Sequence, residues 1–462
     1  LGKATIAGGP TDSIEGLPEG DGTYGGDDDA DNSGVMQYVR IWYGGSVIGQ
    51  NNEINGLTLG GVGSGTTLDH IDIAYNLDDG IEFFGGTVNV KYLSVVFCGD
   101  DAIDTDQGYQ GKIQFAFVIV DRDGHHGTEM DSKIGKTPRS FPQLYNALFV
   151  GSLQNDPNSV SSDDAHPAMM RLRENTGGEF GNIVMVNVKD FGVMQTDCGT
   201  EMRTHTLPAT TDKPDYLWFS DNNIISGSGK TAEDLYDLRT GCAGFSDALT
   251  IDPMLVNIPT NPMGTSDFYF DPRPKKNSPV YDNVDSFPSD SFWTQVSYKG
   301  AFGPEANDLW IAGYTWLASN DQLADTSVLP YDGSANLCGT IFADVTLSAS
   351  VEYKLNCQVF VKNGATLTIE AGTVIKAKKV DAGVDAPALI IEQGAMIMAK
   401  GTAKKPITFT AEDTFDPTAD NFDATKARGL WHCSPRHDFD RDCSDGGDLH
   451  RSGADGGGFH RA

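Results

Sequence analysis

Acidic residues recur at a nearly constant spacing in the first third of this sequence. The run Asp-Asp-Gly-Ile-Glu at 78–82 recurs as Asp-Asp-Ala-Ile-Asp at 100–104, 22 residues further on, and Gly-Thr-Glu at 127–129 repeats the acid another 25 residues later. The coils of a solenoid lie about 4.8 Å apart, so equivalent acids would stack. Two carboxylates about 5 Å apart repel by about 3 kcal/mol at an effective dielectric of about 20, so the stack requires a cation, an arginine or a proton.

Carboxylate oxygens at this density are the ligands that Ca²⁺ prefers, and we expect a calcium site. Aspartates at coil corners that accept hydrogen bonds from backbone N–H groups are the structural alternative, and a catalytic pair of carboxyls is a third. The candidate metal ligands are Asp78, Asp79, Glu82, Asp100, Asp101, Asp104, Asp106, Glu129 and Asp131.

Two arginines follow further along the chain. Arg171 and Arg173 alternate with Leu172, so on a strand they point to the same face. On the acidic face they would be ion-pair partners, or they would bind the carboxylate of an acidic sugar. Parallel β-helix polysaccharide lyases neutralise a uronate with Ca²⁺ while a basic residue removes a proton. The catalytic candidates for such an enzyme are Asp104, Glu129, Arg171 and Arg173.

A histidine pair offers another cluster. His125 and His126, with Asp123 and Glu129, would form a metal or acid–base group, or they are solvated loop residues. The sequence contains no Gly-x-Ser-x-Gly, P-loop or His-Glu-x-x-His motif. Because no complete catalytic motif is present, we expect that the chain is not an enzyme.

The elements that position these residues are short strands. Apolar and polar residues alternate in segments such as 35–41, 68–73 and 113–120, which end in Gly or Asp. A period of 20–25 residues predicts an all-β fold, a parallel β-helix (solenoid). A β-sandwich of hairpins is the alternative, with Asn-Gly signals at 55–56 and 363–364.

Shifts in composition predict four regions. Residues 1–315 form the main β-helix, with an irregular, loop-rich cap from about 250, and 316–337 form a linker. New strands occupy 338–431. The tail at 432–462 is rich in His, Asp and Gly and poor in apolar residues, so we expect it to be disordered or artefactual.

Charge and cysteines restrict the partners. The net charge of −32 excludes nucleic acid and anionic membrane as partners, and no run of 18 apolar residues provides a transmembrane segment. The spacings of the seven cysteines allow the disulfides Cys198–Cys242 and Cys338–Cys357, which we expect, and Cys98 lies in an apolar run as a small buried side chain. Disulfides indicate a secreted, extracellular or cell-surface protein.

Several motifs resemble a family of poorly characterised bacterial proteins. They are Asn-Gly-Leu-Thr-Leu-Gly-Gly-Val-Gly-Ser-Gly-Thr at 55–66, Asp-Asp-Gly-Ile-Glu-Phe-Phe-Gly-Gly at 78–86 and Gly-Lys-Ile-Gln-Phe at 111–115. The proteins are secreted or lipid-anchored surface proteins of marine and Bacteroidetes-type bacteria. The resemblance covers roughly 1–315 and 335–431. It implies a right-handed parallel β-helix and no particular activity.

The order of the segments differs from that family, where a segment like 338–431 comes first and leads directly into one like 1–4. The chain is a piece of a tandem array cut out of phase, or a permutation in which 335–431 packs under Leu1, or the product of an incorrect gene assembly with 432–462 in a wrong frame. Each alternative leaves coil edges at Leu1 and Trp431 as templates for strand addition. Head-to-tail stacking of such edges gives filaments.

These features together predict a Ca²⁺-binding β-helix with a structural, adhesive or assembly role at the cell surface. The expected partners are other copies or adjacent modules through the coil ends, and polysaccharide. One alternative is a carbohydrate-active enzyme, a polysaccharide lyase or a glycoside hydrolase, in a groove near Asp104, Glu129 and Arg173. Another is a non-catalytic glycan-binding module. Its stacking platforms would be Trp42, Tyr43 and Tyr109.

Overall fold

A computed structural model shows the fold of the chain. None of the helices in the part of the chain that it describes has the length and apolar character needed to cross a membrane. The described residues are 1–14, 17, 22–49, 52–120, 124–153, 168–199, 202–204, 206–208, 216–227, 229–231, 233–239, 241–242, 248–262, 269–323, 331, 333–362, 364–378, 387–412 and 431–432.

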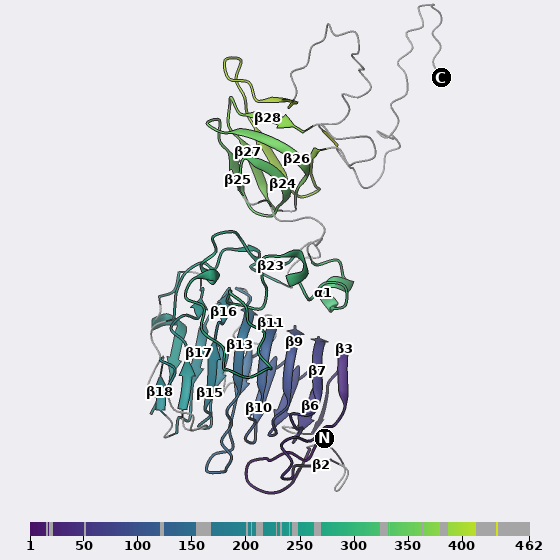
Figure 1. Cartoon of the computed structure of the whole chain (residues 1–462), viewed down its shortest axis with the longest axis vertical. Helices are drawn as coiled ribbons and strands as arrows, with labels where there is room; N and C mark the ends of the chain where they lie inside the picture. Colours follow the sequence, from purple (N-terminus) through teal and green to yellow (C-terminus); the bar gives the residue numbers. More distant parts are fainter. Residues whose placement is uncertain are drawn as a thin grey trace, which may run out of the picture.

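Parallel strands wind into a β-helix over the first half of the chain (Figure 1). Within the described residues one side is a 10-stranded sheet and another a 7-stranded sheet, and all strand pairs in both are parallel. The larger sheet contains β3 (Val35–Trp42), β7 (Thr67–Ala74), β9 (Asn89–Val96), β11 (Lys112–Ile119), β13 (Gln143–Val150), β15 (Gly178–Gly181), β16 (Val184–Val186), β18 (Met202–Thr204), β19 (Tyr216–Phe219) and β20 (Ile224–Ile225). The smaller contains β6 (Leu57–Gly60), β8 (Ile81–Phe84), β10 (Ile103–Asp106), β12 (Thr128–Met130), β14 (Ala168–Leu172), β17 (Phe191–Gln195) and β21 (Tyr236–Leu238).

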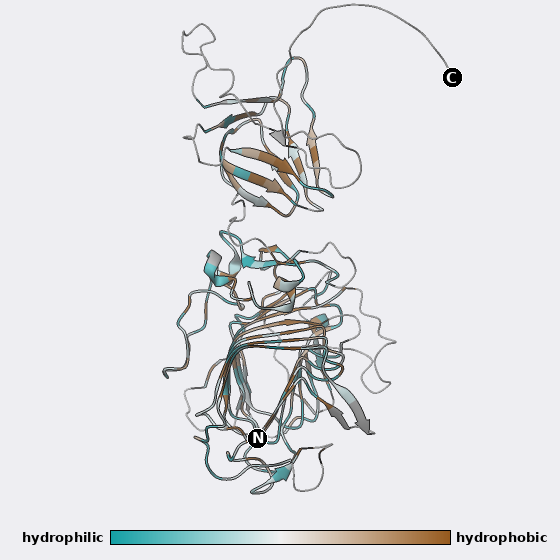
Figure 2. Ribbon diagram, turned by 90° about the vertical axis from the view of Figure 1, so that its right-hand side faces the viewer, coloured by the Kyte–Doolittle hydropathy of each residue, from teal (hydrophilic) through white to brown (hydrophobic). Residues whose placement is uncertain are grey.

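Apolar side chains stack in columns between the sheets (Figure 2). Ile71 pairs with Leu93, which pairs with Ala116, and all three are fully buried. The glycine before β8 has a steric cause. A Cβ added at Gly80 would lie 2.2 Å from Val95 Cγ1, so a larger residue does not fit at this corner.

Four strands of the larger sheet have an irregular backbone at one position each, and the aromatic side chains at these positions stack as a ladder. Tyr38, His70, Tyr92 and Phe115 all have positive φ, between 52° and 62°. Their rings stack with centroids 4.3, 4.3 and 5.0 Å apart. The Trp310 ring packs against this ladder 5.5 Å from Tyr92, so the loop-rich segment is anchored on the strands.

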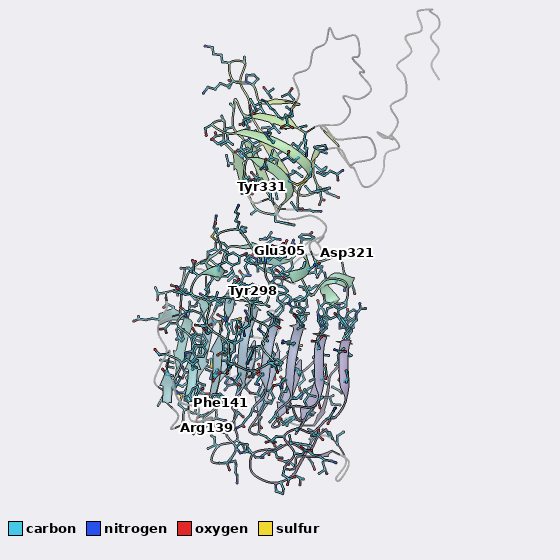
Figure 3. The ribbon with its side chains drawn as sticks, in the orientation of Figure 1. Arg139, Phe141, Tyr298, Glu305, Asp321 and Tyr331 are labelled. Carbon is cyan, nitrogen blue, oxygen red and sulfur yellow. A yellow bond between two sulfur atoms is a disulfide. The ribbon has the colours of Figure 1, made fainter. Side chains whose placement is uncertain are left out.

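That segment forms a cap over the larger sheet, in line with the expected loop-rich region. It buries a second apolar layer, and Figure 3 labels Tyr298 and Glu305 within it. Trp316 and Leu317, at the start of the predicted linker, are buried in this layer. The cap contains β22 (Leu255–Asn257), β23 (Asp271–Pro274), 3₁₀ turns at Pro279–Tyr281 and Ala306–Asp308, and α1 (Trp316–Ser319).

Short elements complete the first helix. Two antiparallel hairpins and one 3₁₀ turn lie outside its main sheets. They are β1 (Asp12–Ser13) with β2 (Thr23–Tyr24), β4 (Ser46–Gly49) with β5 (Asn52–Ile54), and the turn Glu233–Leu235.

A second, smaller parallel β-helix with its own apolar core follows the cap. It contacts the cap where the Phe342 and Tyr269 rings lie 5.0 Å apart, and Figure 3 labels Tyr331 on that side. Its strands are β24 (Asn336–Ile341), β25 (Val345–Leu347), β26 (Glu352–Val361), β27 (Thr366–Ile369), β28 (Val374–Ala377), β29 (Ala388–Ile391), β30 (Met396–Ala399), β31 (Thr408–Ala411) and β32 (Trp431–His432).

The parallel β-helix predicted from the repeat is confirmed, and the sandwich of hairpins is wrong. Both predicted disulfides, Cys198–Cys242 and Cys338–Cys357, are present, and Cys98 is a buried free cysteine. The domain boundaries stay predictions. Of the predicted tail at 432–462, all residues after His432 lie outside the described residues.

Asp72 joins the first helix to its cap. The buried carboxylate accepts hydrogen bonds from Trp42 Nε1 at 2.7 Å and from the Trp316 backbone N–H at 2.8 Å. Asp72→Ala leaves both donors without this acceptor, so we expect it to lower the free energy of unfolding by about 3 kcal/mol, measured by urea denaturation. Asp72→Asn keeps an oxygen acceptor and should cost less than half as much. Equal losses for Asp72→Ala and for Asp69→Ala, on the same strand but partly exposed, would contradict this role.

Candidate functional site

The acids of the sequence repeat form a column on the outer face of the 7-stranded sheet. Glu82 pairs with Asp104, Asp104 with Glu129, and Glu129 with Arg171 on four consecutive strands. The neighbouring residues in these strands, such as Ile103, point inward and are fully buried. The repeat spacing therefore predicted correctly which acids become vertical neighbours.

A second column runs beside the first, two residues further along each strand. Asp106 pairs with Phe84 below it. The Asp131 backbone N–H donates to Thr105 O at 2.7 Å, which places Asp131 on the next coil, and Arg173 follows on the coil after that. The acidic face thus ends in a coil that carries two arginines.

The part of this face formed by β8, β10 and the corners before them is called the lower half here, and its carboxylates lie close together. One oxygen from each of Asp79, Glu82 and Asp104 lies within 4.8 Å of the others, and Asp79 also forms such a group with Asp78 and Asp100. Asp104 Oδ1 is buried and has no hydrogen-bond partner among the described residues. These two groups, which share Asp79, have the oxygen donors that a hard divalent cation takes.

In the part formed by β12 and β14, called the upper half, Arg171 and Arg173 form ion pairs with the carboxylates. Arg171 Nη1 lies 2.7 Å from Glu129 Oε1, and Arg173 Nη2 lies 2.9 Å from Glu129 Oε2. Arg173 Nε also donates to Asp131 Oδ2 at 2.7 Å. Because Glu129 and Asp131 are held in these ion pairs, the part of the face left for a cation is the lower half.

Asp79, Asp104 and Glu129 have raised pKa values. Burial, and then the charges of Glu82 and Asp79, raise the pKa of Asp104 well above its usual value, and burial with the charge of Asp101 does the same for Asp79. Burial raises the pKa of Glu129 to about 8 despite both arginines. Mutual repulsion in the stack therefore favours either protonation or a bound cation.

The histidine pair lies at the corner beside the column. Burial alone would lower the pKa of His125, but hydrogen bonds to Asp100 and Asp101 outweigh it and raise the pKa to about 10. His125 Nδ1 lies 3.1 Å from Asp100 Oδ1. Burial and the charge of His125 lower the pKa of His126, whose Nδ1 accepts from the Ala168 N–H at 2.9 Å. His125 thus acts as a cation on the acidic corner, and Asp123 lies outside the described residues.

The corner aspartates also have a structural role, as the alternative interpretation expected. Asp79 Oδ1 accepts from the Asp101 backbone N–H at 3.0 Å, and Asp101 Oδ1 from the His126 N–H at 2.7 Å. Sequence analysis missed Asn55, whose side-chain amide donates to Glu82 Oε2. Its signal was present, because Asn55-Gly56 stacks below Asp79-Gly80 in the same corner column.

The three proposed sugar platforms do not form one surface. Tyr109 is fully buried and its hydroxyl donates to Val88 O, so its prediction as a stacking platform is wrong. Trp42 is half-buried and bound to Asp72. Tyr43 is exposed, and its hydroxyl accepts from Trp316 Nε1 at 2.6 Å.

A family model described as a pectate-lyase-like β-helix domain matches the chain at residues 1–215 and 339–422, together more than half of it. The chain belongs to this family. No curated protein and no solved structure matches the chain. The acidic face and both arginines of this pectate-lyase-like β-helix lie within the first matched segment.

The stability of this pectate-lyase-like β-helix should fall between pH 6.5 and 8 when divalent cations are removed. The pKa values of Glu129 and His125 are raised to about 8 and about 10, from 4.5 and 6.5 in the unfolded chain, so the folded state holds more protons in this window. His126, with a lowered pKa, contributes little above pH 6.5. We expect a loss on the order of 2 kcal/mol, measured by urea unfolding in chelator.

Glu129→Gln removes the titrating carboxyl and should reduce this pH dependence. A wild-type free energy of unfolding that rises from pH 6.5 to 8 would show that the folded state does not retain these protons.

Proposed function

We propose that the chain is an extracellular or cell-surface parallel β-helix that holds Ca²⁺ in the lower half of its acidic face and has a structural or adhesive role. The observation that carries the proposal is the convergence of Asp79, Glu82 and Asp104 oxygens within 4.8 Å. The two disulfides support an oxidising compartment. The resemblance to bacterial surface proteins and membership of the β-helix family support the same setting.

The electrostatics of the column favour a cation. Stacked carboxylates about 5 Å apart repel by about 3 kcal/mol per pair at an effective dielectric of about 20, and a divalent cation replaces this repulsion with attraction. Glu82 and Asp79 are each only 8% exposed. Because these ligands on the outer face are nearly buried, a structural role of the cation in joining neighbouring coils fits better than a role in bridging a bound glycan.

The arginines do not suit a lyase. Arg171 is buried and paired with Glu129, and hydrogen bonding to Asp131 outweighs burial and raises the pKa of Arg173. A base must lose its proton before it can take one from substrate, and these contacts hold the proton in place. The arginine coil is therefore better suited to ion pairing than to proton abstraction.

Calcium should stabilise the wild-type chain and bind it as measured by isothermal titration calorimetry. At a concentration 100 times the dissociation constant, the linkage is worth about 2.7 kcal/mol, so we expect the melting temperature to rise by several degrees. Asp104→Asn removes a ligand of the Asp79–Glu82–Asp104 group and should weaken binding at least tenfold.

Asp100→Asn is the matched control, because it changes the same charge in the other carboxylate group. It should leave calcium affinity within about twofold. If chelator leaves the wild-type melting curve unchanged and calorimetry detects no binding, the calcium proposal fails. If Asp100→Asn is the variant that loses binding, the cation is held by the Asp78–Asp79–Asp100 group instead.

A second candidate function is hydrolysis of an acidic polysaccharide, in which a substrate carboxylate would replace Glu129 as the partner of Arg171 and Arg173. The pKa of Glu129 is already raised to about 8 by burial, and without the arginines it would stay protonated. A carboxyl that stays protonated at neutral pH can donate its proton to a glycosidic oxygen, while a second carboxylate takes a proton from the attacking water. Release of reducing ends from uronate polysaccharides, lost at least 100-fold in Glu129→Gln, would support this role. No release by the wild-type chain would exclude it for those substrates.

A further inference from the structure

Two consecutive polar residues recur at the same corner of three successive coils. These corners precede β8, β10 and β12, which pair with one another in register. Gly80 N–H donates to Asp101 O at 2.9 Å, which carries the register into the corner. One coil further on, Ala102 N–H donates to His126 O at 3.0 Å. The stacked pairs are therefore Asp78-Asp79, Asp100-Asp101 and His125-His126.

The third pair changes the chemistry of the corner. The first two pairs offer only carboxylate oxygens, which hard cations such as Ca²⁺ prefer. His125 and His126 offer ring nitrogens in their place, and imidazole suits Zn²⁺ and related transition metals. The contact between the corners before β10 and β12 thus brings oxygen and nitrogen donors together.

The donor atoms of this contact lie close to one another. One ligand atom from each of Asp101, His125 and His126 lies within 4.8 Å of the other two. The two imidazole rings have centroids 3.7 Å apart. His125 Nδ1 lies 3.1 Å from Asp100 Oδ1 and 3.4 Å from Asp101 Oδ1, so two carboxylates converge on one ring nitrogen. A cation is favoured at this point, either a proton on His125 or a metal ion that replaces it.

His126 offers a buried ring nitrogen. Its side chain is fully buried, and its Nε2 has no hydrogen-bond partner among the described residues. Its Nδ1 lies 2.9 Å from Ala168 N and 3.3 Å from Ala168 O. When Nδ1 carries the proton, it donates to this oxygen, and Nε2 is left with a lone pair. Such a contact with a backbone carbonyl is also how many metal-binding histidines are oriented.

The cluster is buried except on one side. The side chains of His125 and Asp101 are 12% and 5% exposed, whereas that of Asp100 is 51% exposed. An ion can therefore reach the cluster beside Asp100. Because backbone hydrogen bonds fix both corners, the donors are held in place before an ion arrives.

We propose that Asp101, His125 and His126 bind a transition-metal ion of the zinc class between the corners that precede β10 and β12. Two imidazoles and one carboxylate are a ligand set that Zn²⁺ takes with a water molecule in the fourth position. The site shares no ligand with the Asp79–Glu82–Asp104 group. This inference does not rest on the proposed function.

The test is calorimetric titration of the full-length chain with Zn²⁺, after chelator treatment and in saturating Ca²⁺, which occupies sites made of carboxylates alone. The wild-type chain should still bind Zn²⁺. X-ray absorption of the Zn²⁺-loaded chain should show two imidazole nitrogens at about 2.0–2.1 Å from the metal. A metal shell made of oxygen alone would overturn the proposal.

Single substitutions identify the ligands. His125→Gln and His126→Gln should each lower the Zn²⁺ affinity at least about tenfold, because even the loss of a group that only orients a ligand costs about 10–100-fold. If His126→Gln does not fold, His125→Gln decides, since His125 is partly exposed. Asp104→Asn removes a ligand of the proposed calcium group and should leave Zn²⁺ affinity unchanged, so the two proposals can fail separately.

The control changes histidines elsewhere in the chain. His437→Gln, His450→Gln and His460→Gln together remove three imidazoles from the C-terminal tail and should leave Zn²⁺ affinity unchanged. Loss of binding in this tail variant, with binding intact in His125→Gln, would show that the ion is held elsewhere and would overturn the proposal. So would a wild-type chain that binds no Zn²⁺, or one that binds it only when Ca²⁺ is absent.

Discussion

The in-register stacking of parallel strands is the constraint on which the structure depends. It buries Ile71, Leu93 and Ala116 as one apolar column, and on the outer face it aligns Glu82, Asp104 and Glu129 by the same rule. The winding that builds the core thus brings like charges together. In the upper half Arg171 and Arg173 form ion pairs that offset the repulsion. In the lower half the chain keeps the Asp79–Glu82–Asp104 group, in which the pKa values of Asp79 and Asp104 are raised.

The sequence was most informative where the coils keep a constant length. The steps from Glu82 to Asp104 and from Asp104 to Glu129 differ by only three residues, so the acid column could be predicted. The step from Glu129 to Arg171 is 42 residues, so spacing alone could not pair the two. Tyr109 reads as an exposed aromatic residue because burial depends on the coils above and below it.

The cap and the ladder beneath it show another limit of the repeat. The ladder residues Tyr38, His70, Tyr92 and Phe115 recur on consecutive strands. The reason for their positive φ angles is seen only in the structure, where their rings stack. The irregular segment over them packs Trp310 on this ladder and leaves the acidic face on a different sheet. The cap therefore packs on the 10-stranded sheet, and the acidic face lies on the 7-stranded sheet.

The central claim is that stacked carboxylates in the lower half hold a divalent cation. Anomalous diffraction from crystals grown with Tb³⁺, a Ca²⁺ mimic, tests it most directly. The account predicts a peak at about 2.3–2.6 Å from oxygens of Asp79, Glu82 and Asp104. Crystals whose anomalous maps show no peak on this face, while the three side chains keep their positions, would contradict it and leave protonation as the way the stack is neutralised.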